Sequence, residues 1–297
     1  MRADGDWLVV LSAGRLWCVD IRGGRVAWAD QWRDVDTATL RAAGEALGGL
    51  DRNGGATCRD MRSGGVLMAL RPSRRGVQAD LSPDGLAVVL DGNALEVYDP
   101  RRDGGTLIAK AAVGERNWSL LSVSRRYVVL GCGEGAGTVA ICDMADPSRP
   151  VQAALGGKGD SPRLPAQAET DAKRVYVLWA RRGWEAASGG GQRLDGPALT
   201  ALSLAGGKAL WTAELASPGD GAWTVRLVPC GGVLAVALGG LVGSGASRQL
   251  LVGADSGAVC DAASAAAVTA GHLPPAVLNG RVVLEGRDGV VVLRSRP

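Results

Sequence analysis

CVDIRGGRVAW, residues 18–28, contains the pattern that decides the fold of this chain. A short strand-like segment ends in an Asp, a turn with glycine follows, and a second apolar segment ends in Trp. The strand, Asp, glycine turn and second apolar strand recur in CRDMRSGGVLM at 58–68 and in VYDPRRDGGTL at 97–107. They recur with Ser203 in place of the Asp in ALSLAGGKALW at 201–211. Two apolar segments joined by a turn of this composition predict a β-hairpin. The chain therefore repeats one hairpin.

Weaker copies of the hairpin lie at 141–155, 252–260 and 291–297. We use the Asp position of each copy as a marker, and the seven markers are Asp20, Asp60, Asp99, Asp143, Ser203, Gly253 and Leu293. Successive markers are 40, 39, 44, 60, 50 and 40 residues apart. Four-stranded propeller blades repeat at about 40–50 residues, and Gly-rich insertions account for the two longer intervals.

A second hairpin lies upstream of each marker. LSPDGLAVVL at 81–90 aligns with LSVSRRYVVL at 121–130, and similar hairpins precede the other markers. Each unit therefore has four strands, A to D, joined by short turns, and its neighbours bury its two faces. We predict an all-β chain that forms a β-propeller of about seven four-stranded blades, as a single domain over residues 1–297.

The segment TATLRAAGEALGGL at 37–50 has apolar residues at helical spacing. In the repeat alignment, however, Leu40 matches Leu81 and Gly44 matches Gly85. Because propensity is a weak local signal that tertiary context overrides, the repeat decides here. We predict a strand hairpin in this segment and not a helix.

The register of the repeat predicts incomplete blades at both ends of the chain. Asp4-Gly5-Asp6 aligns with A–B turns elsewhere, so the first blade should lack strand A. The last blade should have A at 276–278, B at 282–285 and C at 290–294, without a strand D. We expect that the chain is either the C-terminal part of a longer protein or is completed by a strand of a partner, because open sheet edges invite strand addition.

Composition excludes several functional classes. A net charge of +3 gives no support for binding to nucleic acid. No run of 18 apolar residues spans a membrane, and the N-terminus lacks the features of a secretory signal, so we expect a cytoplasmic location. The excess of Arg, Ala, Gly and Val is typical of a bacterial genome rich in GC. The 45 glycines indicate many tight turns.

Few residues offer metal or nucleophilic chemistry. The six cysteines are widely spaced, without a CxxC pair, and His272 is the single histidine. Zinc sites need Cys or His pairs two to four residues apart, and a Ser-His-Asp site would have to use His272. We therefore predict buried thiols on strands, with no catalytic residue, metal or cofactor.

Two hairpins resemble the tryptophan-docking motif of pyrroloquinoline-quinone-type (PQQ-like) propellers, in which the Trp packs between adjacent blades. Trp28 and Trp211 match the Trp of that motif, and Gly24 and Gly207 match its Gly. The segment LSPDGLAVVLDGNALEVYD is similar instead to WD-repeat units. The resemblance implies structural docking roles for Trp28 and Trp211, and we expect Asp20, Asp60 and Asp99 to serve the same packing.

The resemblance implies a fold more clearly than an activity, since propellers host many functions. PQQ-dependent dehydrogenases of this type have eight blades, adjacent cysteines and a calcium site, and this chain has no adjacent cysteines. We predict a non-enzymatic scaffold or sensor module within a larger bacterial protein or assembly. A quinoprotein dehydrogenase and a relative of the propeller lipoprotein of outer-membrane assembly remain alternatives.

The B–C and D–A connections of a propeller share one face, where a protein partner would bind. Long segments on this face are 151–171 as a D–A link and 180–197 and 239–249 as B–C loops. The loop at 180–197 carries the candidate interaction residues, which are Arg181, Arg182, Trp184 and Glu185. The alternative is a mobile insertion whose Trp packs back on a blade. Trp118 and Trp223, at the start of strand A in blades 4 and 6, should be buried.

Overall fold

The computed structural model describes the backbone of residues 2–4, 6–12, 15–32, 35, 39–51, 55–71, 77–134, 137–156, 163–180, 196–215, 223–230, 232–240, 247–261, 276–278, 281–286 and 289–293. Side chains are described over the same ranges except at 2–4, 11–12, 223–226, 230, 239–240, 247–249 and from 260 onward. These residues include no α-helix. Nor does this part of the chain contain a helix long and apolar enough to cross a membrane.

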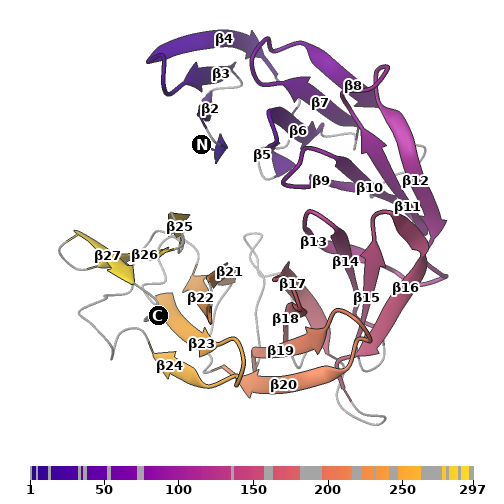
Figure 1. Cartoon of the computed structure of the whole chain (residues 1–297), viewed down its shortest axis with the longest axis vertical. Coiled ribbons are helices and arrows are strands. Elements are labelled where there is room, and N and C mark those ends of the chain that lie inside the picture. The colour runs from indigo at the N-terminus through magenta and orange to yellow at the C-terminus, as the bar shows by residue number, and fades with distance from the viewer. Residues whose placement is uncertain are drawn as a thin grey trace. The chain divides into compact units, whose positions relative to one another are not determined.

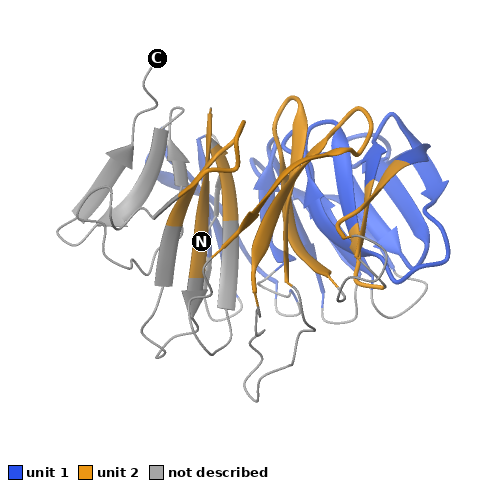
Figure 2. Ribbon diagram, turned by 90° about the horizontal axis from the view of Figure 1, so that it is seen from below, with its two compact units in different colours: residues 1–130, 141–150 blue, residues 131–140, 151–297 orange. Residues whose placement is uncertain are grey.

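The chain divides into two compact units (Figure 2), one of residues 1–130 and 141–150 and one of residues 131–140 and 151–297. The first three sheets lie in the first unit. Their strands are β1 (Arg2–Asp4), β2 (Trp7–Ser12), β3 (Arg15–Asp20), β4 (Arg25–Gln31), β5 (Arg41–Ala43), β6 (Ala46–Leu50), β7 (Ala56–Asp60), β8 (Val66–Leu70), β9 (Gln78–Leu81), β10 (Ala87–Asp91), β11 (Ala94–Asp99) and β12 (Thr106–Ala112).

The fourth sheet contributes residues to both units, and the remaining sheets belong to the second. The strands of the fourth sheet are β13 (Ser119–Val123), β14 (Tyr127–Cys132), β15 (Thr138–Asp143) and β16 (Asp146–Ala154). Those of the later sheets are β17 (Leu164–Thr170), β18 (Arg174–Ala180), β19 (Ala198–Ser203), β20 (Ala209–Glu214), β21 (Trp223–Cys230), β22 (Val233–Gly240), β23 (Ser247–Gly253), β24 (Val259–Asp261), β25 (Ala276–Leu278), β26 (Arg281–Gly286) and β27 (Gly289–Leu293).

In the described part of the chain these strands form seven sheets, six of four strands and one of three, each in the order of the sequence (Figure 1). The predicted four-stranded repeat is therefore confirmed. The seven marker residues, from Asp20 to Leu293, are each the last residue of the third strand of their sheet. Within each unit the first strands of successive sheets lie beside one another, as β5 does beside β1 and β9.

The second strand of each sheet explains the long apolar segments of the sequence. In β14 the five residues after Tyr127 are all buried, and in β18 the six residues after Arg174 are all buried. A strand that alternates between two faces needs apolar residues throughout only when both faces are covered. Both faces of the strands β14 and β18 are therefore covered.

The segment at 41–50 forms the predicted hairpin, since β5 pairs with β6 in antiparallel register. The predicted D–A link at 151–171 is mostly strand, because β16 continues to Ala154 and β17 begins at Leu164. The predicted B–C loop at 180–197 lies between β18 and β19. The predicted B–C loop at 239–249 is shorter than expected, because β22 continues to Gly240 and β23 begins at Ser247.

The predicted absence of strand A from the first sheet is wrong. Asp4 pairs with Trp7 and Arg2 with Val9, so the three residues before the turn are enough to add a short strand. The last sheet has strands A, B and C where they were predicted, and the described residues add no fourth strand to it.

Candidate functional site

The loop residues proposed from the sequence as an interaction site lie outside the described residues. These are Arg181, Arg182, Trp184 and Glu185. His272 also lies outside them, and Trp223 is described by its backbone alone. Trp118 directly precedes β13 and is buried.

The marker aspartates hold the turns between the third and fourth strands. Asp20 accepts a hydrogen bond from the Gly23 amide at 2.9 Å. Asp60 accepts from the Ser63 amide at 2.7 Å, and Asp99 accepts from a turn amide two residues later at 3.1 Å. The side chain of Asp is short enough for its carboxylate to accept hydrogen bonds from backbone amides of its own turn. The geometry assigns these side chains to the turns.

Trp28 links the first sheet to the second. Its indole N–H donates to the Met61 carbonyl at 2.7 Å, and its ring packs against a cluster that includes Leu47. Gly64, at φ 74°, passes beneath the ring, and a Cβ there would lie 2.8 Å from Trp28. Only a residue without a side chain permits this approach. Trp28 itself is partly buried.

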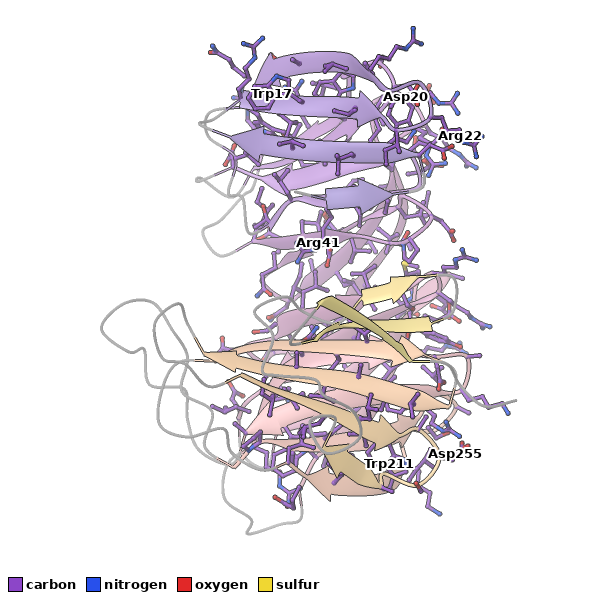
Figure 3. All side chains as sticks on the ribbon, turned by 90° about the vertical axis from the view of Figure 1, so that its left-hand side faces the viewer. Trp17, Asp20, Arg22, Arg41, Trp211 and Asp255 are labelled. Atoms are coloured by element: carbon purple, nitrogen blue, oxygen red, sulfur yellow. The ribbon has the colours of Figure 1, made fainter. Side chains whose placement is uncertain are left out.

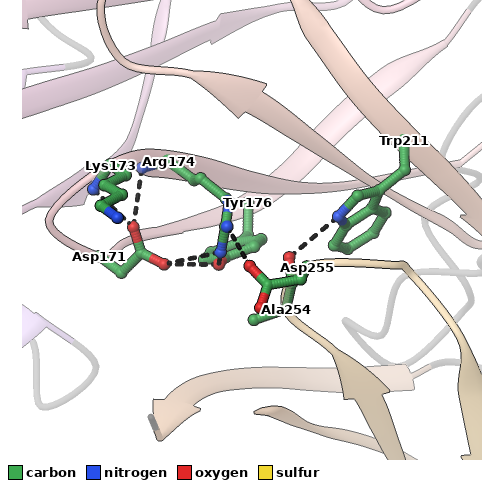
Figure 4. A network of polar contacts seen from close by, with 7 residues as sticks. All are labelled: Asp171, Lys173, Arg174, Tyr176, Trp211, Ala254 and Asp255. Atoms are coloured by element: carbon green, nitrogen blue, oxygen red, sulfur yellow. Dashed lines mark hydrogen bonds and ion pairs between the residues drawn. The ribbon is translucent and has the colours of Figure 1, made fainter. Parts of the chain in front are cut away.

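Trp211 occupies the equivalent place between the fifth and sixth sheets (Figure 4). Its indole N–H donates to the Ala254 carbonyl at 3.0 Å, and Gly257 receives the ring. The centre of the Tyr176 ring lies 6.0 Å from that of Trp211, and the Tyr176 hydroxyl donates to Asp171 at 2.6 Å. Burial and the hydrogen bond to Asp171 raise the pKa of Tyr176 to about 12. The network of Figure 4 thus links the fifth sheet to the sixth.

In three sheets a residue of the fourth strand packs against a glycine of the next sheet, and we call it the docking residue. These are Trp28 on Gly64, Met68 on Gly105 and Trp211 on Gly257. A β-bulge directly precedes each of them, because the pairing skips Ala27, Leu67 and Leu210. A bulge re-aims the side chains beside it and strengthens the local twist. It therefore turns each docking side chain toward the next sheet.

Three of the described cysteines are buried, weakly acidic thiols. Burial raises the pKa of Cys18 to about 11 and the pKa values of Cys58 and Cys142 to about 12. The thiolate is the nucleophile and the metal ligand, so these thiols are inert at neutral pH. Across the described residues, no three His, Cys, Asp or Glu side chains gather closely enough to hold a metal ion.

A polar groove lies where the second sheet meets the third. Its inner part is a cavity of about 70 Å³ with an apolar floor that includes Leu70, Val77 and Val89. Its outer part is an open depression of about 410 Å³ beside the turn between β10 and β11. Asp91 and Glu96 line both parts. This side of the third sheet carries its B–C turn, so the groove is on the face from which partner binding was predicted.

Glu96 is held rigidly at the centre of this groove. Its two carboxylate oxygens accept from Lys110 Nζ at 2.7 Å and from the Tyr98 hydroxyl at 2.6 Å. Burial raises the pKa of Glu96, but the hydrogen bonds from Lys110 and Tyr98 outweigh it and lower the pKa below its usual value. Glu96 is therefore ionised at neutral pH, and nearby Asp91 adds a second carboxylate to the wall.

Sequence reasoning missed this groove, although the pattern of the strand contains a signal for it. In the third strand, side chains three and one residues before the marker face the preceding sheet, as Arg59 does when it pairs with Asp30 at 2.6 Å. Glu96 and Tyr98 occupy those positions before Asp99. A charged residue at an inward position of a repeat whose other members are mostly apolar marks a polar site.

Comparison with known proteins supports the fold. No protein-family model matches the chain, and no curated protein matches its sequence. BamB from Moraxella catarrhalis is similar in structure, with 17% identity, a TM-score of 0.57, and coverage of 97% of this chain and 79% of BamB.

Two further solved structures share the fold. The N-terminal domain of Nup159 has 11% identity and a TM-score of 0.56, with coverage of 97% of this chain and 85% of that domain. A chain of the Mitotic Checkpoint Complex has 14% identity and a TM-score of 0.60, with coverage of 95% and 81%. These neighbours are β-propellers. With its repeated four-stranded sheets, this chain is a β-propeller too.

Proposed function

We propose that this propeller is a protein-interaction scaffold whose groove between the second and third sheets holds a segment of a partner protein. The observation that carries the proposal is the combination of a cavity that has an apolar floor with the hydrogen-bonded, ionised carboxylate of Glu96 in its wall. Binding sites on rigid folds commonly join an apolar floor to a few placed polar groups. Tyr98 and Lys110 hold Glu96 in one orientation, which lowers the entropic cost of binding.

The electrostatics of the groove favour binding over proton transfer. A general acid or base works best with a pKa near 7. In the groove the pKa of Glu96 is lowered, while the pKa values of Tyr98 and Lys110 are raised, Tyr98 chiefly by burial and Lys110 chiefly by its hydrogen bond to Glu96. The pKa of each of these three groups is thus displaced away from 7, so each group keeps one protonation state at neutral pH.

The structural neighbours also support a role in assemblies, since one of them was solved as part of the Mitotic Checkpoint Complex. Within this proposal, the repeat is of the PQQ-like type. Two features support that assignment, namely the indole of Trp28 on Gly64 and the indole of Trp211 on Gly257.

A variant with a side chain that fills the groove tests the proposal. Ala112 is exposed and lines the outer depression, so Ala112→Arg places a long side chain in it without disturbing the core. Ala154→Arg is the matched control. Both alanines are exposed and end the fourth strand of their sheets, and both precede a residue whose amide bonds the B–C turn, Val113 to Asn93 at 2.9 Å and Leu155 to Gly137 at 3.0 Å.

The measurement compares proteins from a cell lysate retained on immobilised wild-type, Ala112→Arg and Ala154→Arg protein. We expect at least one protein that the wild type and Ala154→Arg retain and Ala112→Arg loses, with a dissociation constant at least tenfold weaker for Ala112→Arg when that protein is purified. If every retained protein binds all three forms equally, the groove is not the binding site and the proposal is wrong.

A further inference from the structure

The fourth strand of each four-stranded sheet is the last in the strand order, and in the described part of the chain no strand pairs with its outer side. Such an edge strand has unpaired backbone groups, and proteins commonly protect it with a charged residue or a proline. Five of these six strands have that protection, namely Arg25 and Asp30 in β4, Lys110 in β12, Pro147 and Pro150 in β16, Glu214 in β20, and Asp261 in β24. Figure 3 shows Arg22 in the turn before β4, where its exposed side chain adds a further charge beside that edge.

The strand β8, Val66–Leu70, lacks this protection. Its sequence VLMAL contains no charged residue and no proline. Val66 is 57% exposed, more than Val26 in β4 at 54% or Leu210 in β20 at 49%, and Ala69 is exposed as well. The first and third sheets, which contact the second, belong to the same compact unit as β8. A short apolar strand with an unpaired edge is a template for the addition of another strand.

The register of the repeat shows which backbone groups of β8 point to this edge. Leu215 comes four residues after the docking residue Trp211, and its amide donates to the Pro197 carbonyl at 2.8 Å, toward the third strand of its own sheet. Backbone groups along an edge strand point alternately to the paired strand and to the outer side. The residue directly after a docking residue therefore points its N–H and C=O outward. In β8 this residue is Ala69, because the pairing is regular from Met68 to Leu70.

We propose that β8 pairs in antiparallel register with β8 of a second copy of this chain. In a symmetric pair the same strand stands on both sides, so a charged side chain comes close to its own copy. Like charges on paired strands destabilise the sheet. Since β8 is the one fourth strand of the four-stranded sheets without a charge or a proline, it alone pairs with itself without this cost.

The dimer formed by this pairing is weak and reversible. Only five residues of each copy take part, and interfaces of small area belong to the weak class. The pairing extends the second sheet across the dimer and covers the exposed Ala69 of both copies. It needs no partner protein, so it is independent of the groove at Glu96, and its failure would leave the proposed scaffold function unaffected.

Substitutions of Ala69 test the proposal on the full chain. Ala69→Pro removes the outward N–H, and an edge strand tolerates proline where the N–H faces solvent. Ala69→Lys keeps the N–H and places two like charges across the pair. Ala29→Pro and Ala29→Lys are the matched controls, because Ala29 is also exposed and directly follows the docking residue Trp28 in β4. Thermal unfolding of each variant shows whether it is folded, and if Ala69→Pro is not, Ala69→Lys decides.

Sedimentation velocity at protein concentrations from about 5 µM to about 500 µM measures the association. Hydrogen exchange at the two ends of this range reports on the Ala69 amide, which is protected only when another strand accepts its hydrogen bond. The Ala29 amide, at the equivalent place in β4, is the internal reference for this second measurement.

We expect the wild type and both Ala29 variants to dimerise with equal dissociation constants, and both Ala69 variants to weaken the dimer at least tenfold. Exchange at Ala69, but not at Ala29, should slow in the concentrated sample. A wild type that stays monomeric up to about 500 µM would leave this edge to a strand of another protein and would overturn the proposal. A dimer that Ala69→Lys leaves intact, or that the Ala29 variants weaken equally, would also overturn it.

Discussion

The indole N–H of Trp28 donates to the carbonyl of Met61 at 2.7 Å, while the Met61 amide donates to the Glu45 carbonyl at 2.8 Å. The carbonyl and the amide of Met61 therefore join the fourth strand of the first sheet to the A–B turn of the second. Trp211 reaches Ala254 in the same way, and the Ala254 amide donates to the Gly232 carbonyl at 2.9 Å. The docking residue thus fixes the next sheet through its backbone as well as by packing.

Substitution of Trp28 separates these two contributions. Trp28→Phe keeps most of the apolar contact and loses the hydrogen bond, so we expect a loss of about 1–2 kcal/mol in the free energy of unfolding. Trp28→Ala loses the packing as well and should cost about 2–4 kcal/mol, somewhat less than for a fully buried indole. Urea titrations of the wild type and both variants measure this. Equal losses for Phe and Ala would contradict a packing role for the ring.

Substitution of Gly64 tests the close approach between this glycine and the Trp28 ring. Gly64→Ala forces a left-handed backbone on alanine and also places a Cβ 2.8 Å from the Trp28 ring. Gly104→Ala imposes the same backbone, at φ 75°, in open space. We expect Gly104→Ala to cost about 1–2 kcal/mol and Gly64→Ala about 2 kcal/mol more, because the ring must move. Thermal or urea unfolding measures both, and similar losses would show that the ring moves aside freely.

The spacing of the marker residues predicted the repeat well, because each marker takes part in the hydrogen bonds of the turn that follows the third strand. Asp20 and Asp60 bond their own turns, and that task fixes residue type and position alike. Where the residue changes, to Ser203 or Gly253, the turn keeps its backbone bonds, so the marker still ends the third strand. The register of the first sheet was less predictable. Its strand A is only three residues long, too short for a hydrophobic pattern.

The groove was less accessible to sequence reasoning than the repeat. Asp91, Glu96 and Lys110 come from three strands whose side chains meet only after the sheet forms.

The hydrogen bonds of Glu96 predict a dependence of stability on pH. Because the pKa of Glu96 is lowered in the folded state, its contribution is present above the pKa of the unfolded chain and is lost as pH falls through the folded pKa. Tyr98→Phe removes one of the two bonds and raises the pKa toward its usual value. We therefore expect a smaller change in urea midpoint between pH 7 and pH 3 for Tyr98→Phe than for the wild type.

Tyr127→Phe, in the next sheet, is the control for this measurement, because it removes a tyrosine hydroxyl and leaves both hydrogen bonds of Glu96 in place. Its midpoint should change with pH as that of the wild type does. A Tyr98→Phe profile that coincides with both would show that the hydroxyl has no influence on the ionisation of Glu96.

The third sheet departs from the backbone rule of the others and replaces a missing donor. In the other four-stranded sheets the amide after the marker donates to the A–B turn, as Ile21 does to the Asp6 carbonyl and Leu204 to the Lys173 carbonyl, at 2.8 and 3.0 Å. The equivalent residue of the third sheet is Pro100, which has no N–H. The register places Gly85 opposite Pro100. The carbonyl of the adjacent Asp84 accepts a hydrogen bond from the Arg101 guanidinium. A side chain thus bonds the A–B turn in a sheet where the backbone donor is missing.

This substitution of donors can be reversed by mutation. Arg101→Ala leaves the Asp84 carbonyl without its donor and should cost about 1 kcal/mol, whereas Arg102→Ala, which loses only a surface pair with Asp99 at 3.0 Å, should cost less than about 0.5 kcal/mol. Adding Pro100→Ala returns a backbone N–H opposite Gly85, so Arg101→Ala should cost less in the Pro100→Ala background than in the wild type. Proline removal alone should destabilise the protein, because it frees the unfolded chain. A double-mutant cycle in urea measures the coupling between the two substitutions, and a coupling free energy near zero would show that the restored amide does not bond the A–B turn.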